Sequence, residues 1–368
     1  MTTASDRRTI ETCITALVRG YVRVPSDMGL PTSCEELLHT VGDQAVSSNA
    51  GGKRLRALLA LAAYDAALAT RGDGAGHEPM TRERMTELAC AIEIFQTSAL
   101  VHDDIIDDSD LRRGKPSAHK ALATICADDG VGQSLGILLG DLLATASIDA
   151  ASGAVEGSRH GPQILRAFLD MQRNVDVGQV LDLSVGLMPL DDPNLLERAS
   201  LGVFRWKTAS YTTIAPLELG FLCAGWSREQ AGIHARAIGL PLGVAFQIED
   251  DLLDAVGSST GTGKPVGGDI REGKRTVLLA DALSLSDDRD RRTLRSIFES
   301  DHRSDEDVTQ VVAIFRRSGA VAQSEERIAR LRRESATALD ALPVGRGDRE
   351  RLCDTCALFA ARHSPDAD

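Results

Sequence analysis

The fold is decided by the stretch from Leu88 to Asp108, which reads LACAIEIFQTSALVHDDIIDD. Its apolar part, up to Val101, predicts a buried helix because hydrophobic side chains recur at helical spacing without alternation. The helix ends in acidic residues, and Asp103 and Asp107, four apart, share one face. Like charges at that spacing do not stabilise a purely structural helix, whereas they suit an oxygen-seeking cation such as Mg²⁺. Taken alone, this acidic motif is equally consistent with a metal site and with a solvated acidic helix end.

A second helix end of the same kind spans Phe246 to Asp254 and reads FQIEDDLLD. Asp250 and Asp254 are again four apart at the end of an apolar run. A glycine-rich basic segment follows, with Lys264 and Lys274. Glycines let a backbone approach phosphate closely, and lysines supply positive charge. Two acidic helix ends that each run into a basic segment indicate a site for metal ions and a phosphorylated ligand, more strongly than either does alone.

Basic residues also gather from Gly51 to Arg56, which reads GGKRLR at the predicted start of a helix. Lys53 and Arg56, three apart, are expected to share a face near the helix N-terminus, a position that favours anions. Taken alone, this segment is more often a solvated helix start than a binding site.

The rest of the chain predicts helices and no convincing strand. The expected helical stretches are Leu55–Ala69, Met85–Ile106, Val131–Ala150, Ile164–Val185, Leu195–Cys223 and Gln230–Val256. Pro216 and Pro241 fall inside them and are expected to kink or interrupt the helices. No repeat, linker or shift in composition marks a boundary, so we expect one large all-α domain over residues 1–368. Within it, residues 1–45 form an N-terminal segment, of which about the first forty residues are expected to lie outside the tight core, and residues 364–368 are expected to form a disordered tail.

Composition limits the class of protein further. Hydrophobic residues make up 43% of the chain but aromatic ones only 4%, so the core must be aliphatic. The net charge of −13 argues against general affinity for nucleic acid. No apolar run is expected to reach bilayer length and the first residues are polar, so we expect no transmembrane segment and a cytoplasmic protein. Cys353 and Cys356 are expected to lie one turn apart on a terminal helix rather than to bind metal.

Taken together, these segments resemble the trans-isoprenyl diphosphate synthase, or polyprenyl synthetase, family, which includes farnesyl and geranylgeranyl diphosphate synthases. The matching segments occur in the family's order across most of the chain: Gly51–Arg56, Asp103–Asp107 with Arg112–Gly114, Gly140–Asp141, Gly178–Gln179 with Asp182, Lys207–Thr208, Gln247–Asp254, Lys264 and Lys274. The resemblance implies an all-α fold with a central cavity and an aspartate-rich helix on either side of its mouth. It also implies a homodimer that joins isopentenyl diphosphate head to tail to an allylic diphosphate (dimethylallyl, geranyl or farnesyl), giving a linear all-trans prenyl diphosphate.

The resemblance assigns roles to individual residues. Mg²⁺, three ions with substrate bound, is the expected cofactor, and its ligands or their supports are Asp103, Asp104, Asp107, Asp250, Asp251 and Asp254. The allylic diphosphate is expected on Arg112, Lys207, Lys264 and Lys274. Isopentenyl diphosphate is expected on Lys53, Arg56, Arg113 and Gln96, the last standing where many members carry a histidine. The expected catalytic residues, which stabilise the departing diphosphate and the allylic cation, are Lys207, Thr208 and Gln247.

Product length is expected to depend on the helix before Asp103, because in this family the growing chain runs beside it. Ser98 and Ala99, one turn earlier, are small, whereas Phe95, one turn further back, is large. A helical turn rises about 5.4 Å, close to the length of one isoprene unit. We therefore predict geranylgeranyl diphosphate, with farnesyl diphosphate and products of C25 and above as alternatives. The competing interpretation is that Phe95 is ordinary core packing and another helix sets the floor.

Three other classes of protein share parts of this pattern. A class I terpene cyclase would pair the first motif with an Asn/Ser/Glu metal motif rather than with a second aspartate-rich one. A non-catalytic subunit of a prenyl synthase would have lost an aspartate or basic ligand, and none is lost here. A structural helical protein with solvated acidic patches would show no metal-dependent turnover. Incubation with both diphosphates and Mg²⁺ separates these classes by the product.

Overall fold

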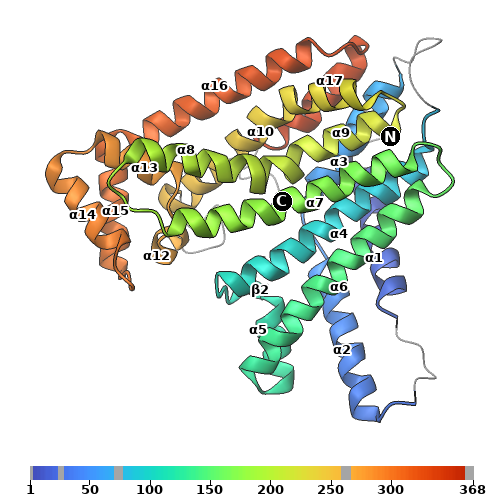
Figure 1. Cartoon of the computed structure of the whole chain (residues 1–368), viewed down its shortest axis with the longest axis horizontal. Coiled ribbons are helices and arrows are strands. Elements are labelled where there is room, and N and C mark those ends of the chain that lie inside the picture. Colours follow the sequence, from blue (N-terminus) through green and yellow to red (C-terminus); the bar gives the residue numbers. More distant parts are fainter. Residues whose placement is uncertain (1–2, 24–28, 70–77, 258–266, 361–368) are drawn as a thin grey trace. The chain divides into compact units, whose positions relative to one another are not determined.

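The computed structural model describes residues 3–23, 29–69, 78–257 and 267–360. These residues are almost entirely helical, which confirms the predicted all-α fold (Figure 1). They form two compact units, one within Met1–Leu169 and Leu219–Arg228 and the other within Asp170–Glu218 and Glu229–Asp368. The single domain over residues 1–368 stays a prediction, and the tail at 364–368 lies outside the described residues.

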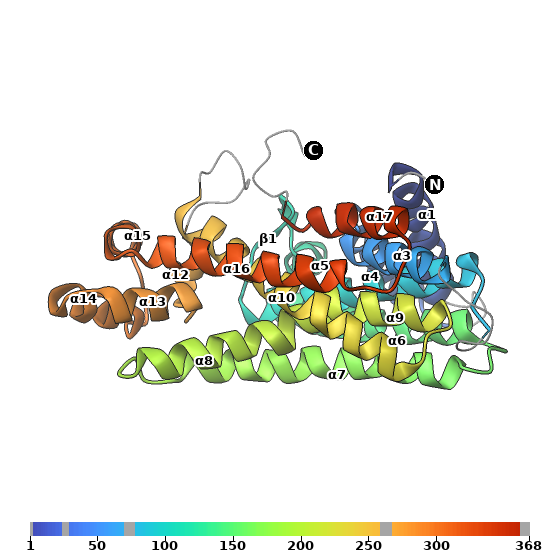
Figure 2. The same cartoon turned by 90° about the horizontal axis from the view of Figure 1, so that it is seen from above.

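The first unit is built around one long helix, α4. Its elements are α1 (Thr3–Tyr21), α2 (Thr32–Ser48), α3 (Leu55–Leu68), α4 (Arg82–Ile106), β1 (Leu111–Arg112), β2 (Lys115–Pro116), α5 (Ala118–Cys126), α6 (Asp129–Val155) and the first part of α7 (Gly161–Gly186). Helix α4 packs against α1, α3, α5 and α6, and its closest neighbour is α6 (Figures 1 and 2). The short β1–β2 hairpin is the one strand pair in the described part of the chain, and the sequence pattern did not predict it.

Helix α4 has the start and the burial that the sequence predicts. Thr81 precedes it as the N-cap, and its hydroxyl accepts a hydrogen bond from the Arg84 N–H. From Met85 to Val101 most of its side chains are buried, in keeping with the expected core helix. Because neighbours cover it on several sides, most of its polar side chains lie in its first and last turns, and the few that are buried between them need partners.

Glycines bring α6 close to its neighbours. A Cβ atom at Gly140 would lie 2.2 Å from Nε2 of His102 on α4, and one at Gly132 would lie 2.4 Å from the Cα atom of Ala123 on α5. The His102 Nε2 atom is 3.2 Å from the carbonyl oxygen of Ile137 and 3.4 Å from Oδ1 of Asp141. The Gly140–Asp141 pair thus serves the contact between α6 and the last turns of α4.

Helix α6 corrects the expectation that no apolar run reaches bilayer length. Among the described helices it alone is long and apolar enough to cross a bilayer. That finding rests on length and composition only, and a core helix of a globular protein has the same properties. Its packing against α4 and α5 accounts only for the buried part of this apolar sequence, because Val131, Ile137 and Leu138 are exposed.

Helix α1 corrects the expectation that about the first forty residues lie outside the tight core. Ile10, Ile14 and Val18 repeat every four residues, and their side chains are 0%, 1% and 0% exposed. This stripe packs α1 against α4 and the neighbouring helices. Helix α1 is therefore part of the core of the first unit, whereas α2 is mostly exposed.

The second unit has a separate aliphatic core. Its elements are the rest of α7, α8 (Pro193–Val203), η1 (Phe204–Ile214), the start of α9 (Ala215–Cys223), α10 (Arg228–Val256), α12 (Gly268–Glu272), α13 (Val277–Leu285), α14 (Asp288–Phe298), α15 (Asp305–Ser318), α16 (Ala320–Asp340) and α17 (Arg346–Ala357). Helix α13 is buried at nearly every position and packs against α8, α15 and α16. Cys353 and Cys356 lie one turn apart on α17 as free thiols, as expected.

The two internal prolines behave differently from one another. Pro216 is the second residue of α9, immediately after the π-helix η1, so the expected continuous helix is divided into α8, η1 and α9. Pro241 lies inside α10, which continues as an α-helix over 29 residues. The predicted interruption at Pro241 is therefore wrong. A proline removes only one N–H, so a single hydrogen bond of the helix is lost while those around it remain.

The close contact between α5 and α6 gives a test by substitution. Gly132→Ala should destabilise the protein by about 1–3 kcal/mol, because the new methyl group meets the Ala123 backbone, which cannot rotate away. Gly153→Ala on the same helix is the control: it has no atom within 4 Å of the added Cβ and should stabilise by roughly 0.5–1 kcal/mol. Urea unfolding followed by circular dichroism measures both changes, and equal midpoints for the two variants would contradict the tight contact.

Candidate active site

The end of α4 carries the first acidic pair as the sequence predicts. The helix continues through Asp103, whose carbonyl accepts a hydrogen bond from the Asp107 N–H at 2.9 Å. The two side chains therefore lie on the same face, Asp103 half-buried and Asp107 exposed at the C-cap. Asp104, between them, is different because its side chain is only 2% exposed.

The Asp104 carboxylate binds Arg112 in strand β1. The guanidinium Nε donates to both carboxylate oxygens, at 2.9 and 3.2 Å, and Nη2 donates to Oδ1 as well. Burial raises the pKa of Asp104, and the pairing with Arg112 opposes that rise. In this arrangement Asp104 fixes the Arg112 guanidinium, the group expected to bind the allylic diphosphate.

The β1–β2 hairpin places the next arginine elsewhere. Its two-residue turn, Arg113 and Gly114, has φ values of 53° and 73°, as a type I′ turn requires. The Arg113 guanidinium donates to the carbonyls of Ala50 and Gly51 at 3.1 and 3.2 Å. The hairpin thus joins Arg113 to the basic segment Gly51–Arg56, with which it was grouped for isopentenyl diphosphate.

Two further aspartates follow the motif, and no role could be assigned to them from the pattern. The ammonium group of Lys120, on α5, lies 3.0 Å from an oxygen of Asp108 and 3.2 Å from one of Asp110. Asp108 has a φ of 48°, a left-handed conformation that ends the helix. These ion pairs hold the loop after α4 against α5.

The basic segment Gly51–Arg56 differs from the prediction in one respect. Helix α3 begins at Leu55, and Arg54, its N-cap, has a left-handed conformation with a φ of 53°. Lys53 therefore lies in the loop and is exposed, whereas Arg56 is in the first turn and 9% exposed. The expectation that Lys53 and Arg56 share a helix face is wrong because the helix starts two residues after Lys53.

The residues expected to set product length lie along α4. Phe95, Ala99 and Asp103 follow one another at intervals of four and form a single row on the helix. Ser98 lies off this row: it is 2% exposed, and its hydroxyl donates to the Gly140 carbonyl of α6 at 2.8 Å. Gln96 is half-buried on the same helix.

The second acidic helix end, on α10, contains two half-buried aspartates and one buried aspartate. Asp250 and Asp254 are half-buried, and the Asp254 carboxylate accepts the Asp269 N–H of α12 at 2.7 Å. Asp251 is 4% exposed and accepts a hydrogen bond from the amide nitrogen of Gln247 at 2.8 Å. Burial raises the pKa of Asp251, and the positive charge of Lys274 acts in the opposite direction.

Gln247 links α10 to the π-helix η1. Its amide oxygen accepts a hydrogen bond from the Thr208 hydroxyl at 2.8 Å, and its amide nitrogen binds Asp251. π-Helical segments are rare and often occur at functional sites. The structure therefore brings together two of the three expected catalytic side chains, Thr208 and Gln247, and shows what orients the amide.

The third expected catalytic residue, Lys207, is bound to α7. Its ammonium group lies 2.7 Å from a carboxylate oxygen of Asp182. A Cβ atom at Gly178 would lie 2.3 Å from the Lys207 backbone nitrogen, so only glycine allows η1 and α7 to approach this closely. Lys274 lies 3.4 Å from a carboxylate oxygen of Asp269. Lys264, also expected to bind diphosphate, lies outside the described residues.

Comparisons with known proteins concern the chain as a whole. The sequence model of the polyprenyl synthetase family matches residues 35–315. A short chain isoprenyl diphosphate synthase of Methanothermobacter thermautotrophicus is 34% identical over 74% of this chain and 74% of its own. An octaprenyl diphosphate synthase of Escherichia coli is 30% identical over 72% of each chain. The crystal structure of a geranylgeranyl pyrophosphate synthase from Corynebacterium glutamicum, complexed with isoprenyl diphosphate and magnesium, superposes with a TM-score of 0.83 and 29% identity, covering 98% of this chain and 100% of that one.

The chain therefore belongs to the polyprenyl synthetase family. It is a prenyltransferase, an isoprenyl diphosphate synthase that elongates prenyl chains. The residues expected at its site stay predictions, since the comparisons concern the chain as a whole.

The ion pair of Asp104 with Arg112 predicts a pH-dependent loss of stability. Arg112→Ala leaves a carboxylate buried without its partner; such a loss costs about 3–5 kcal/mol in full burial, and roughly 2 kcal/mol is expected here because Arg112 is partly exposed. The variant raises the folded-state pKa of Asp104 further, whereas the unfolded value stays near 4. The loss is therefore present at pH 7 and shrinks as the pH falls toward 4, because the Asp104 carboxyl group of both folded proteins then binds a proton and no buried charge is left unpaired.

Urea unfolding between pH 7 and pH 4, with EDTA present, measures this dependence. The double variant Arg112→Ala/Asp104→Asn should recover most of the stability at pH 7, because no buried charge is then left unpaired. A loss that stays constant over this pH range would show that Arg112 contributes by packing alone.

Proposed function

We propose that this prenyltransferase condenses isopentenyl diphosphate with an allylic diphosphate in the presence of Mg²⁺, and that its main product is geranylgeranyl diphosphate. The observation that carries the proposal lies at the end of α4. There an acidic pair, Asp103 and Asp107, directly precedes a hairpin that connects two arginines to two different polar groups. Arg112 is held by a carboxylate of α4, and Arg113 by the loop before α3.

The acidic helix ends fit Mg²⁺ that is shared with a diphosphate. Among the residues that the structure describes, no three His, Cys, Asp or Glu side chains are grouped closely enough to hold a metal ion by themselves. Mg²⁺ is commonly bound by only one or two carboxylates and takes its remaining ligands from water and substrate phosphates. Asp103 with Asp107, and Asp250 with Asp254, supply such pairs, and three ions are part of the proposal. When bound, the ions would neutralise charge on the departing diphosphate.

The protein's own groups would support each step of the reaction. Arg112, Lys207 and Lys274 would stabilise the negative charge that grows as the allylic C–O bond breaks. The double bond of isopentenyl diphosphate then forms the new C–C bond, and a proton is lost to the released diphosphate. The hydroxyl of Thr208 and the amide of Gln247 would stabilise the allylic cation by their dipoles.

A homodimer is also part of the proposal. Helix α6 carries Val131, Ile137 and Leu138, whose side chains are 42%, 47% and 60% exposed. An apolar helix face of this kind is typical of a surface that a second copy covers. The predicted cytoplasmic location and the opposed arrangement of the two acidic helices likewise stay predictions.

The metal assignment is tested by Asp103→Ala. Turnover should fall by about a hundredfold or more, because several kcal/mol of charge stabilisation correspond to at least two powers of ten. Circular dichroism should be unchanged, since the side chain lies at the helix end. Asp108→Ala is the matched control: it removes an acidic residue one turn further on, which pairs with Lys120, and it should keep near-normal turnover. Near-normal turnover in both variants would exclude Asp103 as a ligand.

Product length follows from the row Phe95, Ala99 and Asp103. A chain growing from a diphosphate near Asp103 would pass Ala99 first and meet Phe95 one turn, about 5.4 Å, further on. The small side chain of Ala99 leaves space beside the helix before the large side chain of Phe95 closes it. This arrangement favours a product about one isoprene unit longer than farnesyl diphosphate. Relatives of similar identity make products of different lengths, so the individual side chains must decide this property.

Substitutions along this row test the product prediction. Ala99→Phe should shorten the main product, and Phe95→Ala should lengthen it, as measured by mass spectrometry of the dephosphorylated products. Ser98→Ala is the control and should leave the product unchanged, because Ser98 faces α6. If neither Ala99→Phe nor Phe95→Ala alters the product distribution, the floor of the cavity lies on another helix.

A further inference from the structure

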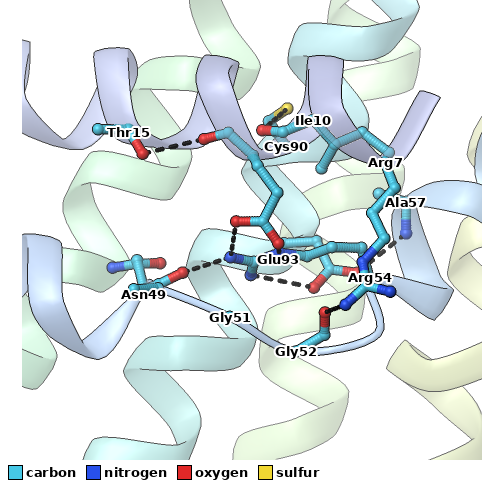
Figure 3. Close-up of polar contacts among 12 residues, drawn as sticks. Arg7, Ile10, Thr15, Asn49, Gly51, Gly52, Arg54, Ala57, Cys90 and Glu93 are labelled. Carbon is cyan, nitrogen blue, oxygen red and sulfur yellow. Dashed lines mark hydrogen bonds and ion pairs between the residues drawn. The ribbon is translucent and has the colours of Figure 1, made fainter. Parts of the chain in front are cut away.

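The side chain of Arg54 is the centre of a buried polar cluster at the start of α3. The residue is 3% exposed and has a φ of 53°, a conformation that costs a non-glycine residue free energy unless its surroundings enforce it. Its guanidinium binds both carboxylate oxygens of Glu11, at 3.0 and 3.1 Å, and the carbonyl of Asn49 (Figure 3). It also forms an ion pair with Glu93 at 3.7 Å.

Glu93 completes the first turn of α3 from outside that helix. Arg54, the N-cap residue, makes no side-chain capping bond. The Glu93 carboxylate, 2% exposed on α4, instead accepts the Ala57 N–H at 3.0 Å. This is the bond that an N-cap side chain usually provides, and a carboxylate is favoured there by the helix dipole. A single buried acid therefore fixes both the backbone of α3 and the side chain before it.

Arginine side chains also hold the loop that leads into α3. Four consecutive carbonyls, from Asn49 to Gly52, each accept a hydrogen bond from a guanidinium. Arg54 binds the first, and Arg7 of α1 binds the fourth at 3.0 Å (Figure 3). Arg113 binds the two carbonyls between them. Arg7 and Glu11 both come from α1, which precedes the stretch that matches the family.

We infer that Arg54, with Glu93 and Glu11, is a positioning group for the isopentenyl diphosphate half of the site. Lys53 and Arg56, which flank it in the chain, are the expected ligands, and Lys53 is turned to the surface because Arg54 is turned inward. The inference rests on the proposed function of these two residues. It adds that α1 and α4 set the geometry of the loop through a residue that itself touches no substrate.

The same unit contains a matched control for this role. Arg82, at the start of α4, lies 3.1 Å from Asp6 of α1 and 3.0 Å from Asp65 of α3. It therefore links the same three helices as Arg54 does, by the same kind of ion pair. Asp65 is eleven residues beyond Arg54 along the chain, roughly 16 Å along the helix, so this second cluster lies away from the basic loop.

The experiment compares Arg54→Lys with Arg82→Lys in the full-length enzyme with Mg²⁺. A lysine keeps the charge but cannot bind two carboxylates and a carbonyl in one plane. Arg54→Lys should raise the KM for isopentenyl diphosphate about tenfold and change the KM for the allylic substrate less than twofold. Arg82→Lys should lower the unfolding midpoint by about as much as Arg54→Lys does, but it should leave both KM values unchanged.

Two further variants keep the test decisive. Glu93→Gln, which retains an acceptor for the Ala57 N–H, should raise the same KM, and so should Glu11→Gln, whose site is 34% exposed and tolerant of change. Lys53→Ala tests the half-site itself and should raise that KM as well. If Lys53→Ala does so while Arg54→Lys and both glutamine variants do not, the positioning role is refuted. An equal rise for Arg54→Lys and Arg82→Lys would refute it too, and no rise for Lys53→Ala would instead refute the proposed half-site.

Discussion

The first unit depends on a single constraint: helix α4 is buried along most of its length, yet it must present charge at its end. Buried backbone and carboxylate groups need partners, because water cannot reach them. Two such carboxylates, Glu93 and Asp104, lie on α4, and each forms an ion pair with an arginine from another segment. The positions of the basic loop and of the hairpin follow from these pairs. The helix that forms the core therefore also organises the polar groups around it.

The local pattern of the sequence predicts much of this. The apolar run to Val101, the helical spacing of Asp103 with Asp107, and the all-α class all depend on near neighbours in the chain, and they are confirmed. The burial of α1 depends on α4, far away in sequence, and was missed although its apolar stripe is regular. The left-handed Arg54 could not be foreseen from the GGKRLR pattern, because Glu93 and Glu11 impose it from other helices.

The basic residues expected at the site are also paired with carboxylates to an extent that the pattern did not indicate. Arg112 binds Asp104, Lys207 binds Asp182, and Lys274 lies close to Asp269. Half-buried cations without an acceptor would be costly, so each has found a carboxylate. A single acidic residue in an apolar helix, such as Glu93, indicates that a buried ion pair is present. Its partner, however, depends on the tertiary fold and cannot be read from spacing.

The orientation of Lys207 and Thr208 depends on the number of residues in the π-helix η1. In an α-helix each residue adds about 100° of rotation, and a π-helix accommodates more residues in each turn. Loss of one residue between Phe204 and Lys207 would therefore restore ordinary helical winding and rotate Lys207 and Thr208 away from Asp182 and Gln247. Substitutions at the surface of η1 would leave those pairs in register. This segment should accordingly tolerate changes of residue type far better than changes of length.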